Sequence, residues 1–400
     1  MKEKRMSEPI VSKIDFSNTE IAFSNKSDKE LKRMAFLFRT MNMSWLVKVG
    51  SPLLILAMKM RLPFVERIVE NTIFHQFCGG TNLLDCQEAI DKLYAQNALT
   101  ILDYGAEAKS TEEELNSVKS EIVRAIEMAA ANNSVPVVSV KISALTDNAL
   151  LEKISSKAEL NIEELDEQSK LIDRLDDICN MAFKMGVGVF IDAEESWVQL
   201  AIDDLVVLMM QKYNKEQCIV YNTYQMYRHD KLTQLKSDHA TAQENGYILG
   251  AKNVRGAYME KERARAEEEN KPSFIHKDKS SVDADYNAAI RYCVEHYLSI
   301  GSCCATHNIK SNLLQAQLID EQGIQKDHPH LNFCQLYGMS DNITFNIAEQ
   351  GFNVAKYVPY GPIKEVIPYL IRRAQENTSV TGEASRELNL ILSEKKRRKL

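Results

Sequence analysis

The sequence predicts an α/β protein built around a single (β/α)8 barrel, and three observations lead to this fold class. After residue 97, short β-rich runs alternate with amphipathic helical stretches, as in parallel sheets covered by helices. Eight such runs occur, the number of strands in a closed barrel of this type. The runs are almost continuously apolar, as expected where helices cover one side of each strand and the barrel interior covers the other.

Each strand is expected at a defined place in the chain. The eight runs span residues 98–104, 136–142, 187–192, 217–224, 247–254, 302–306, 331–336 and 353–358. The main helical stretches between them are 111–132, 162–184, 195–212, 231–245, 283–299, 309–321 and 344–350. An open doubly wound sheet is the alternative, but it usually has fewer strands and a glycine-rich phosphate loop after the first. The single GxG motif, 186–188, precedes its strand, which is the reverse of a dinucleotide fingerprint.

Two regions are expected, an N-terminal helical arm over residues 1–97 and the barrel domain over 98–400, which ends in a lid helix and a basic tail. The arm contains an apolar block at residues 44–58. Lys48 and a Gly-Ser-Pro break interrupt this block, so it falls short of the ~20 apolar residues that cross a bilayer. Packing on the main domain, a helical hairpin and an interfacial helix on a membrane remain as interpretations, and packing is favoured over membrane contact.

The composition excludes several classes of protein. Of 400 residues, 44% are apolar and 26% are charged, which is an ordinary globular balance. There are 49 Lys and Arg against 56 Asp and Glu, and the net charge of −7 argues against nucleic-acid binding. Eight cysteines without a CxxC pair, and a polar start to the chain, indicate a cytoplasmic protein without a zinc site.

Polar side chains follow every predicted strand, and chemistry in such barrels collects at these strand ends. The set comprises Asp103, Lys141, Asp192, Gln225, Lys252 with Arg255 and Tyr258, Thr306 with His307 and Asn308, Tyr337, and Tyr357. A lysine such as Lys141 is costly to bury alone, and Asp192 on the adjacent strand is its expected partner. A stabilising ion pair, a ligand-facing pair and a Schiff-base lysine all remain open.

The last helical stretch of the barrel domain has an unusual polar face. Tyr369, Arg372, Arg373 and Glu376 follow the spacing i, i+3, i+4 and i+7 and therefore share one side of a helix. Adjacent arginines suit a bidentate grip on a carboxylate or a phosphate. A salt-bridged surface helix is the alternative.

Seven short motifs occur in one order and together are far more specific than any single motif. They are Lys-Ile-Ser-Ala-Leu (141–145), Asp-Ala-Glu-Glu (192–195), Tyr-Gln (224–225), Val-Arg-Gly-Ala-Tyr (254–258), Ala-Thr-His-Asn (305–308), Gln-Leu-Tyr-Gly-Met (335–339) and Tyr-Leu-Ile-Arg-Arg-Ala-Gln-Glu-Asn (369–377). Over residues 97–390 the chain resembles the proline dehydrogenases, flavoenzymes that oxidise L-proline to Δ1-pyrroline-5-carboxylate, in their monofunctional form. The resemblance implies a distorted (β/α)8 barrel with FAD at its mouth, in agreement with the strand count.

The resemblance also implies roles for individual residues. Arg372 and Arg373 would hold the proline carboxylate above a charged floor of Lys141 and Asp192, and these four with Tyr258 form the expected catalytic set. The residues expected to surround the proline ring are Tyr258, Leu336, Tyr357 and Tyr369, with Glu376 pairing an arginine to close the lid. Gln225 would reach the reactive edge of the isoalloxazine. The remaining FAD residues would be Lys252, Val254, Arg255, Gly256, Ala257, Thr306, His307 and Asn308.

Two departures from the family pattern concern the expected cofactor residues. Lys252 stands where bacterial bifunctional members often have arginine, and Arg255 stands where they have lysine. Met259 replaces a frequent tryptophan. Positive charge is retained near the flavin, but the hydrogen-bond geometry differs because arginine and lysine are not equivalent donors.

The resemblance implies a quinone as electron acceptor, and with it a peripheral contact with the inner membrane. Residues 44–58 and the basic run 395–399 are the expected contact segments, although a solvated helix end is the alternative for the tail. Two other classes of function remain. A class I aldolase would use Lys141 as its nucleophile, and a non-enzymatic binder would have the pocket without turnover.

Overall fold

The chain folds into a closed barrel of eight parallel strands in a computed structural model that describes residues 14–60, 62, 64–105, 109–378 and 383–400. The strands are β1 (Leu99–Tyr104), β2 (Val137–Val140), β3 (Gly188–Ile191), β4 (Val220–Gln225), β5 (Leu249–Val254), β6 (Ile300–Ala305), β7 (Leu331–Leu336) and β8 (Val354–Tyr360). Each strand pairs with the next along the chain, and β8 closes the barrel on β1. The fold class predicted from the sequence is confirmed.

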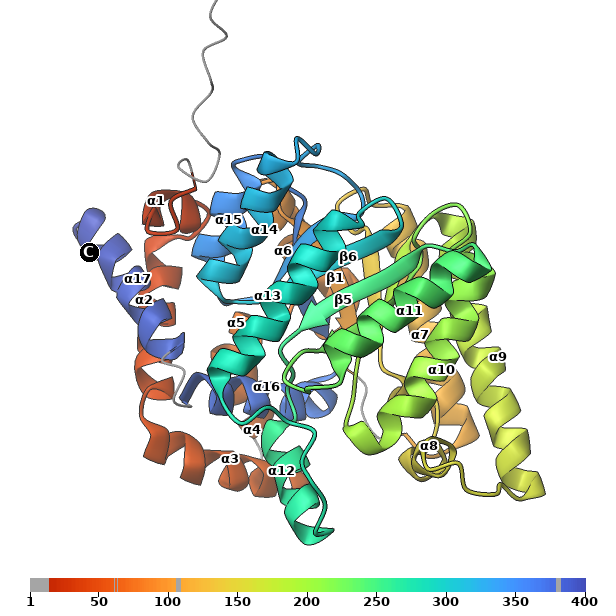
Figure 1. Cartoon of the computed structure of the whole chain (residues 1–400). Coiled ribbons are helices and arrows are strands. Elements are labelled where there is room, and N and C mark those ends of the chain that lie inside the picture. The colour runs from red at the N-terminus through yellow and green to blue at the C-terminus, as the bar shows by residue number, and fades with distance from the viewer. Residues whose placement is uncertain (1–13, 61, 63, 106–108, 379–382) are drawn as a thin grey trace, which may run out of the picture.

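Helices precede the barrel and surround it (Figure 1). Before β1 lie α1 (Thr19–Ala22), α2 (Asp28–Met41), α3 (Ser44–Lys59), α4 (Val65–Val69), the π-helix η2 (Glu70–Phe74), α5 (His75–Phe77), η3 (Leu84–Cys86) and α6 (Gln87–Tyr94). Between β1 and β5 lie α7 (Glu112–Ala130), η4 (Ile142–Ala144), α8 (Asn148–Ser155), α9 (Ile162–Met185), α10 (Ser196–Tyr213) and α11 (Lys231–Asn245). The remainder are α12 (Met259–Glu268), α13 (Lys279–Glu295), α14 (Ile309–Glu321), α15 (Asp341–Ala348), α16 (Ile363–Thr378) and α17 (Glu383–Arg397).

Alternation along the strands decides which side chains enter the barrel lumen. Side chains such as Leu102 and Val189 belong to the large cluster beneath the covering helices. The intervening positions form a separate lumen cluster, whose buried members are Ile101, Phe190, Tyr221, Cys303, Cys334, Ala355 and Tyr357. Because the side-chain period of a strand is two, Asp103, Gln225 and Lys252 share the lumen face of their strands. The polar strand ends therefore converge on one mouth.

Local sequence signals fix the helix ends. Capping boxes formed by Thr111 with Glu114 and by Asn161 with Glu164 start α7 and α9. Strand β4 begins at Val220 rather than at residue 217, because the Asn214 carboxamide oxygen accepts hydrogen bonds from the Ile219 and Val220 N–H groups and holds the preceding segment as a loop. Helix α13 starts before the predicted residue 283, since Asp278 caps it.

The apolar block of the arm forms α3, and most of its large side chains are exposed. Trp45, Leu53 and Leu56 are 65%, 58% and 53% exposed, whereas Val47 and Leu54 pack against the cluster that includes residues of α16. The favoured interpretation of packing on the main domain therefore holds for one side of this helix only. Pro52 lies within this helix. No single described helix is long and apolar enough to cross a bilayer, although α2 and the greater part of α3, bent by 83°, meet the length and composition criteria as a pair.

The basic tail is tied to the arm. Helix α17 packs along α2, and the Arg398 guanidinium donates hydrogen bonds to the carbonyls of Phe23 and Lys26, each at 2.7 Å. At the other end of α17, Ser385 lies beside Asn42. The tail and α3 therefore lie at opposite ends of α2, about 21 Å apart for a helix of 14 residues.

Candidate active site

A buried charged pair forms the floor of the barrel mouth. The Lys252 ammonium lies 2.5 Å from Asp192 Oδ1, and the Tyr357 hydroxyl donates to Asp192 Oδ2 at 2.6 Å. The same ammonium lies over the rings of Phe190 and Tyr357, 5.2 and 4.7 Å from their centroids. Burial opposes ionisation of Asp192, but the attraction of Lys252 and the two hydrogen bonds outweigh it and hold its pKa below the usual value.

Lys141 stands at the end of β2 and completes the floor. It is within electrostatic reach of three carboxylates, Asp103, Asp192 and Glu194, and lowers the pKa of each. Burial nevertheless raises the pKa of both Asp103 and Glu194 above their usual values. The predicted proximity of Lys141 and Asp192 is thus present, but Lys252 is the lysine that bonds Asp192 directly.

Helix α16 brings the predicted arginines to the mouth. The Arg373 guanidinium is buried and lies 5.2 Å from the centre of the Tyr369 ring, one helical turn earlier. Burial and Glu194 raise the pKa of the Tyr258 phenol while Arg372 lowers it, so Arg372 is within electrostatic reach of Tyr258. The side chain of Glu376 lies outside the described part of the structure. Leu336 packs with Tyr357 in the lumen cluster.

The helix that begins after Tyr258 is anchored across the mouth. Glu262 on α12 is buried, and its carboxylate accepts hydrogen bonds at 2.6 Å from both the N–H and the hydroxyl of Ser196 at the start of α10. Glu262 thus supplies the side-chain cap that the residue preceding α10 does not provide. This contact ties α12, which begins directly after Tyr258, to the segment that follows β3.

A second cluster follows β5 and β6. The Arg255 guanidinium donates to Asp283, Thr306 and Ser311 at 2.8, 2.6 and 3.1 Å and stacks 4.2 Å from the Tyr286 ring centre. Asn308 caps α14 by accepting from Ser311 N at 3.1 Å. Arg255, Thr306 and Asn308 therefore form one rigid unit beside the mouth.

His307 lies in the most cationic environment of this cluster. Its Nδ1 is 2.9 Å from Ser340 Oγ, and Arg386 on α17 donates to its carbonyl at 3.2 Å and to Ser340 Oγ at 3.0 Å. Burial lowers the His307 pKa well below its usual value, and Lys356, Arg386, Arg373 and Arg255 lower it further. Lys356 is fully buried and paired with Asp341, so it cannot contact a ligand. The guanidinium groups of Arg255, Arg373 and Arg386 beside a neutral imidazole at the N-terminus of α14 suit a diphosphate.

The loop after β5 gives a ligand access to the backbone. Gly256 has φ +126°, and a Cβ there would lie 2.6 Å from the Tyr227 ring, so glycine is required. Gly256 and Ala257 are exposed, and Val254 ends β5 at the rim. A planar group can therefore approach the main chain beside Lys252.

A family model described as proline dehydrogenase matches residues 86–386. The chain belongs to the proline dehydrogenase family. Mitochondrial proline dehydrogenase 1 of Dictyostelium discoideum is 32% identical over 374 residues, covering 82% of this chain and 65% of that protein. The carbapenem antibiotics biosynthesis protein CarD of Pectobacterium carotovorum is 31% identical over 322 residues, covering 80% of this chain and 83% of that protein.

The chain thus spans just under two thirds of the Dictyostelium relative, and 41% of human mitochondrial proline dehydrogenase 1, to which it is 35% identical over 252 residues. Among solved structures, proline utilization A of Bdellovibrio bacteriovorus, inactivated by N-propargylglycine, superposes with a TM-score of 0.71 at 21% identity. That match covers 95% of this chain and 40% of that one. It supports the barrel fold of the proline dehydrogenase family.

Several residues of the site were not found by sequence reasoning. Glu194 lies in the Asp-Ala-Glu-Glu motif but was assigned no role in the site, yet its carboxylate is buried and accepts from Ser143 N at 2.9 Å. Arg386 and Ser340 join the His307 cluster from distant parts of the chain, which no motif indicated. The signal available for Glu194 was its position close to a strand end, three residues after Ile191, the last residue of β3.

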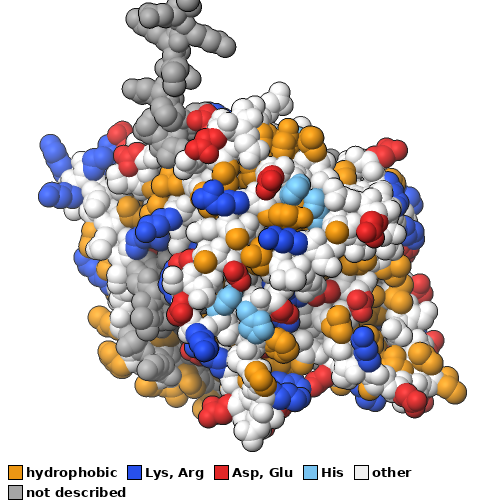
Figure 2. Space-filling view, in the orientation of Figure 1, with side chains coloured by type: hydrophobic (Ala, Val, Ile, Leu, Met, Phe, Trp, Pro, Cys, Tyr) orange, Lys and Arg blue, Asp and Glu red, His pale blue; other side chains and the backbone are white. Residues whose placement is uncertain are grey.

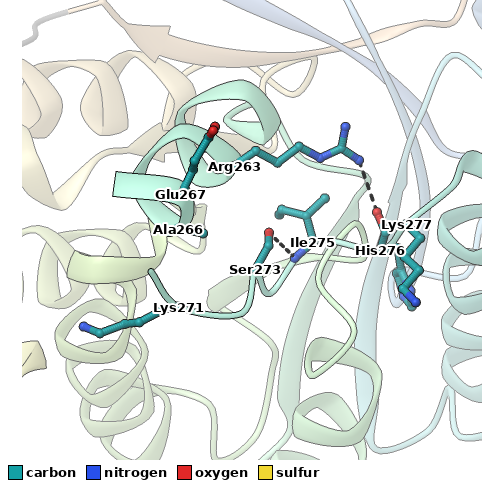
Figure 3. Close-up of a pocket in the computed structure, with 8 residues that line it drawn as sticks. All are labelled: Arg263, Ala266, Glu267, Lys271, Ser273, Ile275, His276 and Lys277. Atoms are coloured by element: carbon teal, nitrogen blue, oxygen red, sulfur yellow. Dashed lines mark hydrogen bonds between the residues drawn. The ribbon is translucent and has the colours of Figure 1, made fainter. Parts of the chain in front are cut away.

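A separate cleft of about 410 Å³ lies between α12 and the segment 271–277 (Figure 3). Arg263 donates to the His276 carbonyl across it at 3.3 Å, and Ser273 Oγ accepts from Ile275 N. Its charged lining residues Arg263, Glu267, Lys271 and Lys277 are exposed, and it shares no residue with the predicted site. The cleft is therefore distinct from the predicted site at the barrel mouth.

Proposed function

We propose that this member of the proline dehydrogenase family oxidises L-proline to Δ1-pyrroline-5-carboxylate with FAD at the barrel mouth, the first step of proline catabolism. The observation that carries the proposal is the juxtaposition of the Asp192–Lys252–Tyr357 floor with the arginine face of α16. A carboxylate-bearing cyclic amine between them would meet guanidinium groups on one side and a fixed ion pair on the other.

The residues present fit FAD. Arg255 and Arg386 beside His307, with Thr306 and Asn308, would hold the diphosphate, while Gln225, Lys252, Val254, Gly256 and Ala257 would line the ring system. When bound, FAD supplies a hydride acceptor for the carbon next to the proline nitrogen.

The protein's own groups would orient the substrate and stabilise charge. Arg372 and Arg373 would bind the carboxylate and fix the ring against the mouth, which removes orientational freedom before reaction. Tyr258, Leu336, Tyr357 and Tyr369 would surround the ring and exclude water. The Lys252 ammonium, held by Asp192, would stabilise the negative charge that accumulates beside it. Lys141 would balance the buried carboxylates of the floor.

A visible spectrum of the purified protein tests this function. We expect flavin absorption bands at roughly 380 and 450 nm that bleach on addition of L-proline. A colourless protein that borohydride traps through Lys141 would instead indicate the aldolase. Bound flavin that proline does not reduce would indicate a binding protein.

We further propose that the electrons pass to a quinone, with α3 as the surface that contacts the membrane. Exposed apolar side chains gather over α3 and its surroundings, at the lower left edge of Figure 2, and include Trp45, Val49, Leu53, Leu56, Phe64 and Ile68. Between residues 44 and 64 the sequence has three basic residues and no acidic residue, whereas the whole chain has a net charge of −7. An apolar surface with basic residues suits an anionic bilayer.

The position of α3 links this surface to the mouth. Helix α3 packs on α16, which carries Arg372 and Arg373, and both lie in the lower part of Figure 1. A bilayer on α3 would therefore lie next to the substrate site. Because Arg397 and Arg398 are bonded within the chain, we expect the tail to contribute less than α3.

Flotation with vesicles containing anionic lipid separates the two segments. We expect Leu53→Glu with Leu56→Glu to abolish co-flotation, and replacement of Lys395 and Lys396 by glutamine to reduce it only slightly. Flotation of the double glutamate variant at the wild-type level would refute the contact through α3.

A further inference from the structure

A continuous series of hydrogen bonds runs from Asp203 in the barrel wall to Gln225 at the mouth, between β3 and β4. It starts at Asp203, a buried residue of α10, whose carboxylate accepts four hydrogen bonds. Oδ1 accepts from Gln199 Nε2 at 2.8 Å and Asn222 Nδ2 at 2.9 Å, and Oδ2 accepts from Lys231 Nζ at 2.8 Å and Gln234 Nε2 at 2.9 Å. An ionised carboxylate can only accept, so Asp203 fixes the direction in which each surrounding amide points.

Gln199 connects Asp203 to the residues at the barrel mouth, and its own orientation is set by Asp203. Because the Gln199 amino group faces Asp203, its Oε1 faces the Glu194 N–H, which donates to it at 2.7 Å. The Glu194 carbonyl in turn accepts from Gln225 Nε2 at 2.8 Å. A carbonyl cannot donate, so the amino group of Gln225 must point at Glu194, and its oxygen points away.

The oxygen of Gln225 is thereby presented to the lumen. Gln225 is 2% exposed, and it lies on the same face of β4 as Tyr221 and Thr223. The described residues provide no hydrogen-bond donor to its Oε1. This oxygen is not fully buried, so it stays open to the lumen, where it can accept a hydrogen bond from a ligand N–H.

Oxidised isoalloxazine has a single N–H group, at N3, whereas its reactive N5 is itself an acceptor. We propose that Asp203 and Gln199 are positioning residues that turn the Gln225 carboxamide so that its oxygen accepts a hydrogen bond from flavin N3–H. This inference rests on the proposed function, since it takes the ligand to be a flavin. It moves Gln225 from the reactive edge, where the resemblance had placed it, to the pyrimidine edge of the ring.

The test compares the affinities of the apoprotein for FAD and for N3-methyl-FAD, measured by quenching of flavin fluorescence. The methyl group removes the only N–H donor of the oxidised ring. We expect wild type to bind N3-methyl-FAD at least tenfold more weakly than FAD. In Gln199→Met this ratio should fall towards one, because Glu194, and with it Gln225, is no longer held in place.

Asn214→Leu is the matched control. Asn214 is also a buried carboxamide that is hydrogen-bonded on both sides, donating to Val220 O, Ile248 O and Cys218 Sγ and accepting from Ile219 N and Val220 N, but it lies at the other end of β4. Its loss should lower stability and leave the ratio of affinities unchanged. Asp203→Asn keeps the side-chain shape but adds an N–H donor. If Gln199→Met does not fold, this variant should show the same decrease in the ratio of affinities for FAD and N3-methyl-FAD.

Three results would overturn the inference. Equal wild-type affinities for the two flavins would show that Gln225 presents no acceptor to N3. An unchanged ratio in a folded Gln199→Met or Asp203→Asn protein would show that the series does not position it. A ratio lost equally in Asn214→Leu would indicate general loosening. The proposed function fails differently, through wild-type protein that binds no FAD or whose flavin proline does not reduce.

Discussion

Two buried pairs of aspartate and lysine lie on opposite sides of the barrel wall and differ in how completely they are satisfied. Outside the wall, Asp203 accepts four hydrogen bonds, and Lys231 donates to both Asp203 and Gln234. In the lumen, Lys252 has a single hydrogen-bond acceptor among the described residues, Asp192, and otherwise faces the Phe190 and Tyr357 rings. An ammonium has three N–H donors, so Lys252 keeps two for a ligand at the open mouth, whereas Lys231 keeps one and lies buried in the wall.

From this difference we expect the wall pair, Asp203 with Lys231, to stabilise the fold, and the lumen pair, Asp192 with Lys252, to bind a ligand. Removing one partner of a buried pair is costly in either place, because the other charge is left uncompensated. The cost should appear mainly in turnover for the lumen pair and in folding stability for the wall pair.

Asp192→Asn should have the largest effect on activity. It removes the charge that holds Lys252 and that partly balances Lys141. Breaking a buried pair costs about 3–5 kcal/mol, and if this cost falls on the transition state, kcat/KM for proline decreases by about 10² to 4 × 10³-fold. Asp341→Asn is the control, because Asp341 pairs with the buried Lys356 at 2.8 Å on the outer side of β8. A loss in Asp341→Asn as large as in Asp192→Asn would contradict the distinction.

Lys231→Met should lower the free energy of unfolding by about 3 kcal/mol, because it leaves a buried carboxylate without its cation. Urea denaturation followed by circular dichroism measures this change. Lys215→Met, at an exposed position whose ammonium donates to the Asn245 carbonyl, should change stability by less than about 0.5 kcal/mol. An unchanged midpoint for Lys231→Met would mean that the wall pair is not structural.

Arg372→Met should raise KM for proline by roughly 10–100-fold, since a hydrogen bond to a charged group contributes about 1.5–3 kcal/mol. FAD should remain bound, because the cations around His307 are untouched. Steady-state kinetics and the visible spectrum of one preparation measure both properties. An unchanged KM would remove Arg372 from the carboxylate site.

The sequence predicted more about the lumen than about the wall, for physical reasons. Strand ends converge in any closed barrel, so Lys141, Asp192 and Lys252 could be assigned to one mouth from the pattern alone. Which lysine bonds Asp192 could not be predicted, because it depends on the register between strands that are not adjacent. Asp203, Gln199 and Arg386 lie on helices, where a polar residue indicates solvent as readily as a buried network.

The arm was predicted least well. An apolar block such as residues 44–58 normally indicates burial, and periodicity carries no information about whether a partner surface exists within the chain. The exposure of Trp45 and Leu53 is therefore a result that only the structure provides. The division between arm and barrel at residue 97 remains a prediction.

The carboxylate of Glu394 is also buried, at the contact between arm and tail, and here we expect the smallest effect on stability. Burial alone would raise the pKa of Glu394, but hydrogen bonds from Arg397, Arg398 and Thr19 outweigh it and bring the pKa to about 2. A carboxylate whose pKa is lower in the folded than in the unfolded state stabilises the protein above its unfolded pKa of about 4.3. That stabilisation is lost as the pH falls through this value towards 2.

Between pH 5 and pH 3 this group should therefore remove about 1 kcal/mol from the free energy of unfolding. In Glu394→Gln the decrease over this range should be smaller by that amount, as measured by denaturant unfolding at each pH. Glu20→Gln, which removes an exposed partner of Arg397, should keep the wild-type slope. If Glu394→Gln also keeps the wild-type pH dependence, the ion pairs of Arg397 and Arg398 with Glu394 do not hold α17 against the arm. The contact between arm and tail would then depend on the apolar contacts of α2 with α17.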